Sequence, residues 1–362
     1  AVALDAAIGE AARLIGAARL PLITGLGTDV EGMRAVMALA DRAGGVVDHA
    51  LSDGMYRNTE VLQTSGWFMT TLTEVRNRAD LIIIVGTDVA ALKPRFFERI
   101  AAVEEPMFLP PGKTRTIVFL GDGLDASTAK GGRIGDVISL PCRPEATGEV
   151  ISTLRARLKG SPVAAAEVGG VALSAIDDLV ARCRAAAYGV VAWGPGNLAP
   201  TGADLTVRAI SDLVKDLNLT TRFAGLSLGG SEGVPTAAAV AAWQSGFPLR
   251  VSFAGGKPDY DTRRYSALGM IERGDADLVV WIASFMPDLA PPATDIPLIL
   301  LGTPGIATAA TPAVSIPVGT PGLDHAGRLI RCDSVVSLPL PSLDRSSLPA
   351  VADVLARIQA SL

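Results

Sequence analysis

Apolar positions along the chain follow two alternating patterns. Short β-branched runs, typical of strands buried on both faces, are separated by longer segments in which apolar residues recur every three or four positions. The first such segment is one example, with Ile8, Ala11 and Ile15 on one helical stripe. This alternation predicts a parallel sheet with helices on both faces.

The same patterns predict the individual elements. The predicted helices cover residues 4–18, 30–43, 71–78, 145–159, 172–186 and 204–217. The predicted strands cover residues 20–24, 46–48, 81–85, 116–120, 137–140, 189–193, 221–223 and 277–282. The stretch between the second strand and residue 71 is expected to be irregular.

The second half of the chain repeats the scheme of the first. Residues 79–83, Ala-Asp-Leu-Ile-Ile, have an echo in residues 276–280, Ala-Asp-Leu-Val-Val. A Gly-Ser-Pro linker at residues 160–162 would join the halves. We therefore expect an α/β fold of two Rossmann-like doubly wound units, residues 1–161 and residues 162–362, facing each other across a cleft at the carboxyl ends of their strands.

Composition excludes several classes of protein. The 362 residues are 49% hydrophobic and 19% charged, which leaves ample apolar surface for a core. The net charge is −5 and no segment is dense in Lys or Arg, so nucleic-acid binding is not expected. The longest uncharged run, residues 296–323, contains prolines that a spanning helix would not tolerate. We expect a cytoplasmic protein without membrane association.

Histidine and cysteine are scarce. The two histidines, His49 and His325, and the three cysteines, Cys142, Cys183 and Cys332, show none of the spacings typical of zinc or iron–sulfur sites. The scattered cysteines are expected to be reduced and buried. No metal site built by this chain alone is predicted.

Two glycine motifs resemble dinucleotide-binding fingerprints. Gly25-Leu26-Gly27 lies between a predicted strand and a helix, but the third glycine of the fingerprint falls at Val30, and Asp29 would occupy the anion site. Gly194-Pro195-Gly196 fits a looser pattern, without an acidic residue after the next strand. We interpret both as tight strand-to-helix turns.

Two further motifs have poor structural context. Residues 111–114, Pro-Gly-Lys-Thr, resemble the end of a phosphate-binding loop whose first glycine is replaced by Met107. Residues 225–229 have the spacing of a nucleophile elbow around Ser227, with His325 as the only available base. Because glycines and a serine follow where a helix should begin, a mobile cleft loop is favoured over a hydrolase.

Polar and glycine residues follow several predicted strands and are expected to line the cleft. Ser52, Asp53 and Gly54 come just beyond the second strand, and Asp88, Lys93 and Arg95 come beyond a later one. The full set of cleft residues is Gly25, Gly27, Ser52, Asp53, Gly54, Asp88, Lys93, Arg95, Gly194, Gly196 and Ser227. None of them is expected to be catalytic.

The order of several segments resembles the B subunits of formylmethanofuran dehydrogenases, which belong to the molybdopterin oxidoreductases. The similar segments are residues 19–25, 75–81, 86–88, 93–95, 257–260 and 277–282, spread over nearly the whole chain. The resemblance implies two Rossmann-like domains that enclose tungsten or molybdenum on a bis-pterin guanine dinucleotide.

The chain departs from that family at the cofactor. The metal-binding loop, Cys-His-Gly-Pro, is matched by Ser52-Asp53-Gly54-Met55, so the thiolate ligand and the histidine beside it are replaced. The family's Gly-x-Asn followed by His-Pro-Arg becomes Gly86-Thr87-Asp88 with Lys93-Pro94-Arg95, and the Asp88 carboxylate would repel the cofactor's phosphates. We therefore expect a vestigial cleft and the loss of this cofactor.

The altered pattern resembles the B subunits of the bacterial formyltransferase/hydrolase complexes of methylotrophs. This implies a non-catalytic subunit of a hetero-oligomer in one-carbon metabolism. The complex passes a formyl group from formyl-tetrahydromethanopterin to a methanofuran-type carrier and hydrolyses it to formate. The implied partners are an amidohydrolase-like subunit, a formyltransferase subunit and the remaining structural subunit.

Three arginines, Arg95, Arg263 and Arg264, are candidates for holding a polyglutamyl carrier chain, with solvated loop charge as the competing explanation. Two other functions stay open. The oxygens of Ser52 or Asp53 would ligate the metal in an active tungsten or molybdenum formylmethanofuran or formate dehydrogenase. A nicotinamide-binding enzyme of ordinary Rossmann type would be stabilised by NAD.

Overall fold

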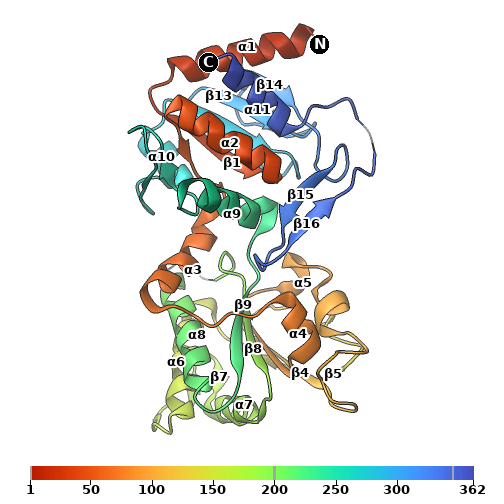
Figure 1. The fold of residues 1–362 in the computed structure, drawn as a ribbon. Coiled ribbons are helices and arrows are strands. Elements are labelled where there is room, and N and C mark those ends of the chain that lie inside the picture. The colour runs from red at the N-terminus through yellow and green to blue at the C-terminus, as the bar shows by residue number, and fades with distance from the viewer. Residues whose placement is uncertain (1, 199–200, 345) are drawn as a thin grey trace. The chain divides into compact units, whose positions relative to one another are not determined.

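The computed structural model describes residues 2–198, 201–344 and 346–362, which form two compact α/β units (Figure 1). Unit 1 comprises the chain up to Asp53 together with Gly230–Leu362, and unit 2 comprises Gly54–Gly229. The chain thus leaves unit 1, builds the whole of unit 2, and returns. The boundary expected at residue 161 falls inside unit 2 and has to be redrawn.

Unit 2 is built on a fully parallel sheet with the strand order β5-β4-β3-β8-β9. Its strands are β3 (Leu81–Val85), β4 (Arg115–Leu120), β5 (Ile134–Leu140), β8 (Gly189–Trp193) and β9 (Phe223–Ser227). The pairing of β8 with β3, from Leu81↔Gly189 to Val85↔Trp193, joins segments that the sequence analysis placed in different units. This pairing is the physical reason for the different boundary.

Alternation along β3 explains why helices cover both faces of this sheet. Leu81, Ile83 and Val85 enter one core cluster, whereas Ile82 and Ile84 enter another. The first cluster is completed by α6 (Thr147–Leu158), α7 (Leu173–Ala185) and α8 (Ala203–Leu217), and the second by α4 (Leu72–Arg78), α5 (Val89–Leu92) and the π-helix η1 (Phe97–Ala101). The short elements η2 (Pro144–Ala146), β6 (Glu167–Val168) and β7 (Val171–Ala172) complete unit 2.

Unit 1 has a seven-stranded sheet with the order β11-β10-β2-β1-β12-β13-β14. Its strands are β1 (Pro21–Gly27), β2 (Val46–Val47), β10 (Val251–Ser252), β11 (Asp259–Tyr260), β12 (Leu278–Ala283), β13 (Leu298–Gly302) and β14 (Val314–Pro317). The strands from β2 to β14 are parallel, and β10 and β11 add an antiparallel edge. The Rossmann-like α/β architecture predicted from the sequence is confirmed.

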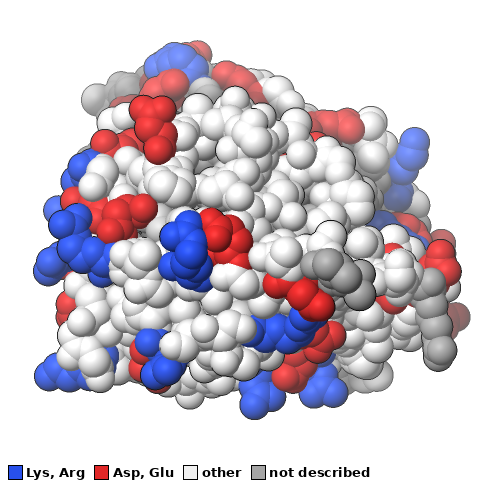
Figure 2. Space-filling model, turned by 90° about the horizontal axis from the view of Figure 1, so that it is seen from above, with Lys and Arg blue, Asp and Glu red and all other residues white. Residues whose placement is uncertain are grey.

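Helices and a hairpin surround the sheet of unit 1. They are α1 (Val2–Ala17), α2 (Val30–Ala43), η3 (Ser231–Gly233), α9 (Val234–Ser245), α10 (Ala267–Arg273), α11 (Val351–Ala360), and the hairpin of β15 (Gly327–Ile330) and β16 (Ser337–Leu340). Helix α2 packs against α9 and α11, and α10 packs with Leu22 and Val46 in a separate cluster. On the face seen in Figure 2, acidic and basic side chains are interspersed among large uncharged areas.

Three local expectations are corrected by the structure. Gly25-Leu26-Gly27 continues β1 instead of forming a turn, with an irregular register opposite β12. The stretch expected to be irregular contains α3 (Ser52–Ser65), so Ser52 begins a helix. Ser227, expected in a mobile loop, is the last residue of β9, and Leu226 before it packs into the core of unit 2. Among the described residues, no helix combines the length and apolar character needed to cross a membrane.

Candidate functional site

The predicted cleft residues fall into two groups, one in each unit. In unit 1, Gly25 has a φ of +75°, and a Cβ at this position would lie 2.5 Å from the carbonyl oxygen of Ile282 in β12. The carbonyl of Gly27 accepts a hydrogen bond from the Ser284 hydroxyl at 2.8 Å. Both glycines therefore serve the close pairing of β1 with β12.

Ser52 and Asp53 both contact the guanidinium of Arg250. Its Nη2 donates to Ser52 Oγ at 3.0 Å and to the carboxylate of Asp53, and its Nη1 donates to the carbonyl of Thr262. Arg250 is 5% exposed, and both it and Leu249 have positive φ angles, of +49° and +76°. Such a backbone persists only where its surroundings impose it, so the guanidinium is built firmly into this position.

Asp48 provides the buried countercharge at the end of β2. Its Oδ2 accepts from Ser52 Oγ at 2.9 Å and from the Ala267 amide at 2.8 Å, and lies 3.5 Å from Arg250 Nε. Burial raises the pKa of Asp48 to about 7, while the charge of Arg250 opposes this shift. Above that pH the site is a buried ion pair of Asp48 with Arg250.

His49 lies next to this pair and is neutral. Its Nδ1 accepts from the Leu51 amide at 3.0 Å, and its Nε2 lies 2.9 Å from the carbonyl oxygen of Glu232. These partners require the proton to sit on Nε2. Burial lowers the pKa of His49 to about 4. At neutral pH this ring is a fixed hydrogen-bonding group that joins two loops of unit 1.

In unit 2, hydrogen bonds between neutral groups join the carboxyl ends of β3, β8 and β9. The Gly194 amide donates to Thr87 Oγ1 at 2.7 Å, which ties the segment after β3 to the segment after β8. Asn58 of α3 accepts from the indole Nε1 of Trp193 at 2.9 Å and donates to Ser227 Oγ at 2.9 Å. Two of the predicted residues, Gly194 and Ser227, are thereby held at the carboxyl end of the sheet.

The glycines Gly54 and Gly196 lie close together in unit 2, since a Cβ on Gly54 would be 3.1 Å from the Gly196 amide nitrogen. Asp88 and Lys93 cap the two ends of α5. The Asp88 carboxylate accepts from the Ala91 amide at 3.0 Å and so takes the donors that an anion would use.

The three arginines proposed to hold a carrier chain belong to different units. Arg95 lies in unit 2 and pairs with Glu98 at 2.6 Å, with its side chain 61% exposed. Arg263 and Arg264 lie in unit 1, where their backbone amides donate to Asp261 Oδ1 at 2.9 and 2.8 Å. A joint role in gripping one ligand stays a prediction.

The residues of the Ser52–Asp53 segment do not fit a tungsten or molybdenum centre. The oxygens that would ligate the metal are bound to the guanidinium of Arg250, and a second cation beside it would be repelled. In the described ranges, no group of three or more His, Cys, Asp or Glu side chains is placed to hold a metal ion. The serine and aspartate are instead parts of a protein ion-pair cluster.

Arg250 and Asn58 organise the two groups, and sequence reasoning missed both. Arg250 is the one charged residue of the run Phe-Pro-Leu-Arg-Val-Ser-Phe at residues 247–253, and a lone cation in an apolar run was a usable signal. Asn58 gave no such signal, because the helix that carries it was not predicted.

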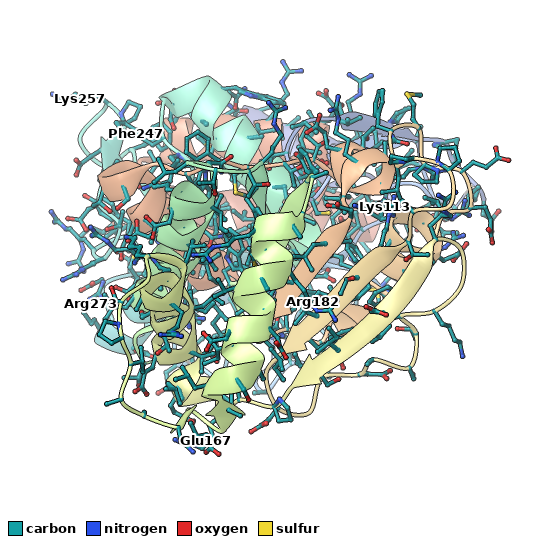
Figure 3. All side chains as sticks on the ribbon, turned by 90° about the horizontal axis from the view of Figure 1, so that it is seen from below. Lys113, Glu167, Arg182, Phe247, Lys257 and Arg273 are labelled. Atoms are coloured by element: carbon teal, nitrogen blue, oxygen red, sulfur yellow. The ribbon has the colours of Figure 1, made fainter. Side chains whose placement is uncertain are left out.

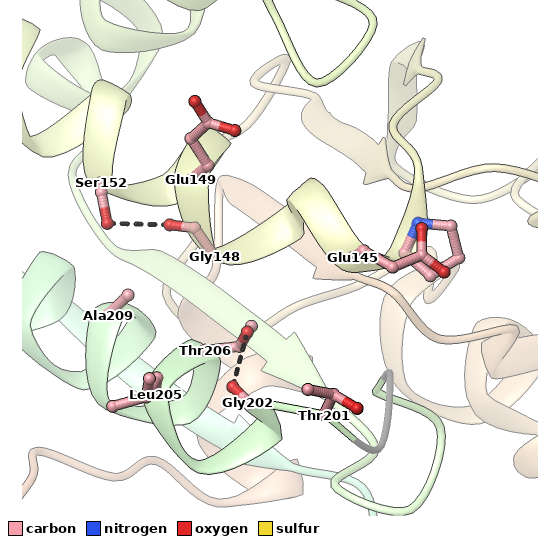
Figure 4. Close-up of a pocket in the computed structure, with 10 residues that line it drawn as sticks. Glu145, Gly148, Glu149, Ser152, Thr201, Gly202, Leu205, Thr206 and Ala209 are labelled. Atoms are coloured by element: carbon pink, nitrogen blue, oxygen red, sulfur yellow. Dashed lines mark hydrogen bonds between the residues drawn. The ribbon is translucent and has the colours of Figure 1, made fainter.

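A surface pocket of ≈ 390 Å³ lies in unit 2 between the first turns of α6 and α8 (Figure 4). Its lining includes Glu145, Glu149 and Leu205 and shares no residue with the predicted set. The Thr206 hydroxyl on its wall donates to the carbonyl of Gly202 at 3.3 Å. The pocket is therefore distinct from the groups at the strand ends.

Comparisons with curated proteins identify similar subunits in two kinds of enzyme complex, although no protein-family model matches the chain. The B subunit of the formyltransferase/hydrolase complex Fhc of Methylorubrum extorquens is 31% identical over 283 residues, 78% of this chain and 72% of that protein. The B subunit of the tungsten-containing formylmethanofuran dehydrogenase 2 of Methanocaldococcus jannaschii is 31% identical over 281 residues, 77% of this chain. The chain spans only 64% of the length of the dehydrogenase subunit.

Among solved structures, a chain of the crystal structure of the formyltransferase/hydrolase complex FhcABCD from Methylorubrum extorquens, in complex with methylofuran, superimposes with a TM-score of 0.83. The match has 29% sequence identity and covers 99% of this chain and 96% of that chain. The similarity in structure therefore extends over both units.

Proposed function

We propose that this chain, which belongs to the family of B subunits of formyltransferase/hydrolase complexes, is a structural subunit of such a complex. It would bind an amidohydrolase-like subunit, a formyltransferase subunit and the remaining structural subunit. The assembly transfers a formyl group from formyl-tetrahydromethanopterin to a methanofuran-type carrier and hydrolyses it to formate. Neither step is assigned to residues of this chain.

The observation that carries the proposal is the guanidinium of Arg250 on the oxygens of Ser52 and Asp53. In a dehydrogenase of this family the matching loop would have to bind a metal, and the cluster of Asp48 with Arg250 already uses its donors and its charge. The methylofuran in the crystal structure of the Methylorubrum complex supports a carrier of the same class for the complex of this chain.

The test is the composition and activity of the purified complex. Tungsten and molybdenum are measured per chain by mass spectrometry of the elements, and pterin by the fluorescence of its oxidation product. We expect far less than one metal and one pterin per chain, and formate release from formyl-tetrahydromethanopterin that requires the other subunits. Stoichiometric metal and pterin on this chain would instead favour a working dehydrogenase.

Two variants separate these outcomes. Ser52→Ala and Asp53→Ala each remove an oxygen that a metal would need, and the assembled complex is checked by its native mass. For a structural subunit, the kcat of formate release stays unchanged in complexes of wild-type mass. For a dehydrogenase, viologen-linked oxidation of formate or formylmethanofuran disappears while the complex stays assembled.

A further inference from the structure

Two aspartates of the chain are followed directly by glycine, in the pairs Asp53–Gly54 and Asp122–Gly123. In such a pair the glycine amide nitrogen can attack the side-chain carboxyl carbon of the aspartate and close a five-membered succinimide ring. Glycine favours this reaction, because it has no side chain to shield its nitrogen and its backbone turns easily. Both pairs have the same reacting groups, so a difference in their reactivity must come from the fold.

The first pair is held in the first turn of α3. The carboxylate of Asp53 accepts a hydrogen bond from the guanidinium of Arg250. Gly54 is packed so closely that a Cβ on it would lie 3.1 Å from the amide nitrogen of Gly196. Ring closure requires the Asp53 carboxyl to turn toward the Gly54 nitrogen while the backbone between them rotates. The hydrogen bond, the helix and the packing all oppose these movements.

The second pair lies in a turn that follows β4. Asp122 and Gly123 are both exposed, and Gly123 has a φ of +68°. A Cβ on Gly123 would meet no described atom within 4 Å. Among the described residues, neither the Asp122 carboxylate nor the Gly123 amide has a hydrogen-bond partner. The contacts that restrain Asp53 and Gly54 therefore have no counterpart in this turn.

Two other aspartates of the same region show the contrast within unit 2. Asp136 of β5 accepts a hydrogen bond from Arg182 at 3.0 Å, beside the strands seen in Figure 3. Asp125 accepts from the Ser127 amide at 2.8 Å. Of these three aspartates, Asp122 alone combines a carboxylate that no such bond holds with a glycine after it.

The chain before the reacting bond is fixed to the sheet. The Asp122 amide donates to the carbonyl of Cys142 at 3.0 Å, and the Gly121 amide donates to the carbonyl of Leu140 at 3.1 Å. These two bonds tie the end of β4 to the end of β5. A rearrangement on the carboxyl side of Asp122 leaves both donors in place, so unit 2 should keep its fold.

We propose that Asp122 is a site of spontaneous modification, at which the backbone rearranges to isoaspartate, and that the fold protects Asp53 from the same reaction. The Gly123 nitrogen bonds to Cγ of Asp122 and loses its proton, and one carboxyl oxygen leaves as water. Water then adds to the main-chain carbonyl of the ring and breaks its bond to the Gly123 nitrogen. The chain now continues through Cγ, and the former main-chain carbonyl is a carboxylate. The water lost is regained, and no redox partner is needed.

The test uses the purified full chain, stored at pH 6 and sampled over several weeks. Electron-transfer mass spectrometry of its peptides distinguishes isoaspartate from aspartate at each site. In the folded chain we expect isoaspartate to form about tenfold faster or more at Asp122 than at Asp53. In urea, where the contacts of both sites are lost, the two rates should become similar. The Tm of the stored chain should stay at its initial value.

Two variants check that this turn is the main site of reaction. Asp122→Glu keeps the charge, but ring closure would then need a six-membered ring, which forms slowly. Labelling of the whole chain by an isoaspartate methyltransferase should fall close to background in this variant. Gly123→Ala shields the nitrogen and disfavours the positive φ, and we expect about tenfold slower isomerisation at Asp122. Circular dichroism and Tm confirm that both variants are folded.

Three results would overturn the proposal, which is independent of the proposed function. The first is equal isoaspartate formation at Asp53 and Asp122 in the folded chain. The second is methyltransferase labelling that Asp122→Glu leaves unchanged. The third is a rate difference between the two sites that persists in urea, because local sequence rather than the fold would then set the rates.

Discussion

The two units place polar groups at the same edge of a parallel sheet but stabilise them differently. In unit 1 the strand ends carry buried charge, with Asp48 and Arg250 in one cluster. In unit 2 a neutral network lies at the strand ends, with Asn58 between Trp193 and Ser227. A buried charge depends on its opposite charge, whereas a neutral network loses one hydrogen bond at a time. The units should therefore differ in how much one substitution destabilises them.

The difference also bears on cofactor chemistry. A bound metal ion carries positive charge that balances the carboxylates around it, so a metal site needs no arginine or lysine for that purpose. Unit 1 holds an arginine at such a place, and that arginine bonds the Asp53 carboxylate as well as Ser52. The two units thus have related architecture with different electrostatic roles.

The largest expected effect comes from Arg250→Met at pH 8, where Asp48 is ionised. Removing the guanidinium leaves a buried carboxylate without its countercharge, and we expect a loss of about 3–5 kcal/mol in the free energy of unfolding. Urea unfolding measures it. The double variant Asp48→Asn with Arg250→Met should recover about half or more of this loss. A loss under about 1 kcal/mol would mean that the ion pair does not stabilise unit 1.

The next largest effect is on the pH dependence of the free energy of unfolding, to which Asp48 and His49 of unit 1 contribute. Asp48 has a pKa of about 7 in the folded chain, above its ordinary value, so its contribution to stability is present at low pH and is lost as pH rises from about 4 to 7. His49 has a pKa of about 4, below its ordinary value, so its contribution is present above pH 6.5 and is lost as pH falls toward 4. Over this range the two slopes oppose each other.

Single variants should uncover the opposing slopes. Relative to wild type, Asp48→Asn makes stability rise with pH by up to about 4 kcal/mol between pH 4 and 7, and His49→Gln makes it fall by up to about 3 kcal/mol between pH 4 and 6.5. Thermal unfolding across this pH range measures both. Parallel pH profiles for the two variants would contradict the opposite burial effects on these groups.

In unit 2 we expect a smaller effect from Asn58→Leu. The substitution leaves the buried indole N–H of Trp193 and the Ser227 hydroxyl without their shared partner. We expect it to lower the free energy of unfolding by about 1–3 kcal/mol. Ser227→Ala is the matched control, since it removes one bond of the network and spares the indole, and should cost about 1 kcal/mol or less. Equal losses in the two variants would show that the indole bond contributes nothing.

Much of the fold could be predicted from the sequence because strands such as β3 are apolar on both faces. The run Leu81–Val85 supplies both core clusters of unit 2, and no other element type accommodates it so well. The boundary between the units could not be predicted. The pairing of β8 with β3 crosses more than a hundred residues, and apolar pattern carries no information about which strands are neighbours.

The sequence could indicate which polar residues lie near the ends of strands, but it could not indicate which side chains these residues contact. Ser52 and Asp53 were expected just beyond the second predicted strand, where α3 begins, and Asp48 was expected as the last residue of that strand, although β2 ends at Val47. Their partner Arg250 comes from a segment about 200 residues later in the sequence, and only folding shows that a guanidinium meets these oxygens. Asn58 was hidden because α3 has few apolar residues, Met55, Tyr56, Val61 and Leu62, and no cap residue of the usual kind before Ser52.

The smallest expected effect on stability comes from an exposed ion pair, Arg95 with Glu98, which lies outside the Asp48–Arg250 cluster and the Asn58 network. Arg95 forms an ion pair with Glu98 at 2.6 Å, shorter than the 3.5 Å between Arg250 and Asp48, but its side chain is 61% exposed. Water and salt screen such a pair, so Arg95→Ala should leave the urea midpoint unchanged, and added salt should not alter that result. If Arg95→Ala destabilised the chain as much as Arg250→Met, distance alone would decide the strength of these pairs. The proposed distinction between charged and neutral strand ends would then have no basis, because burial would not be the factor that makes the Asp48 cluster strong.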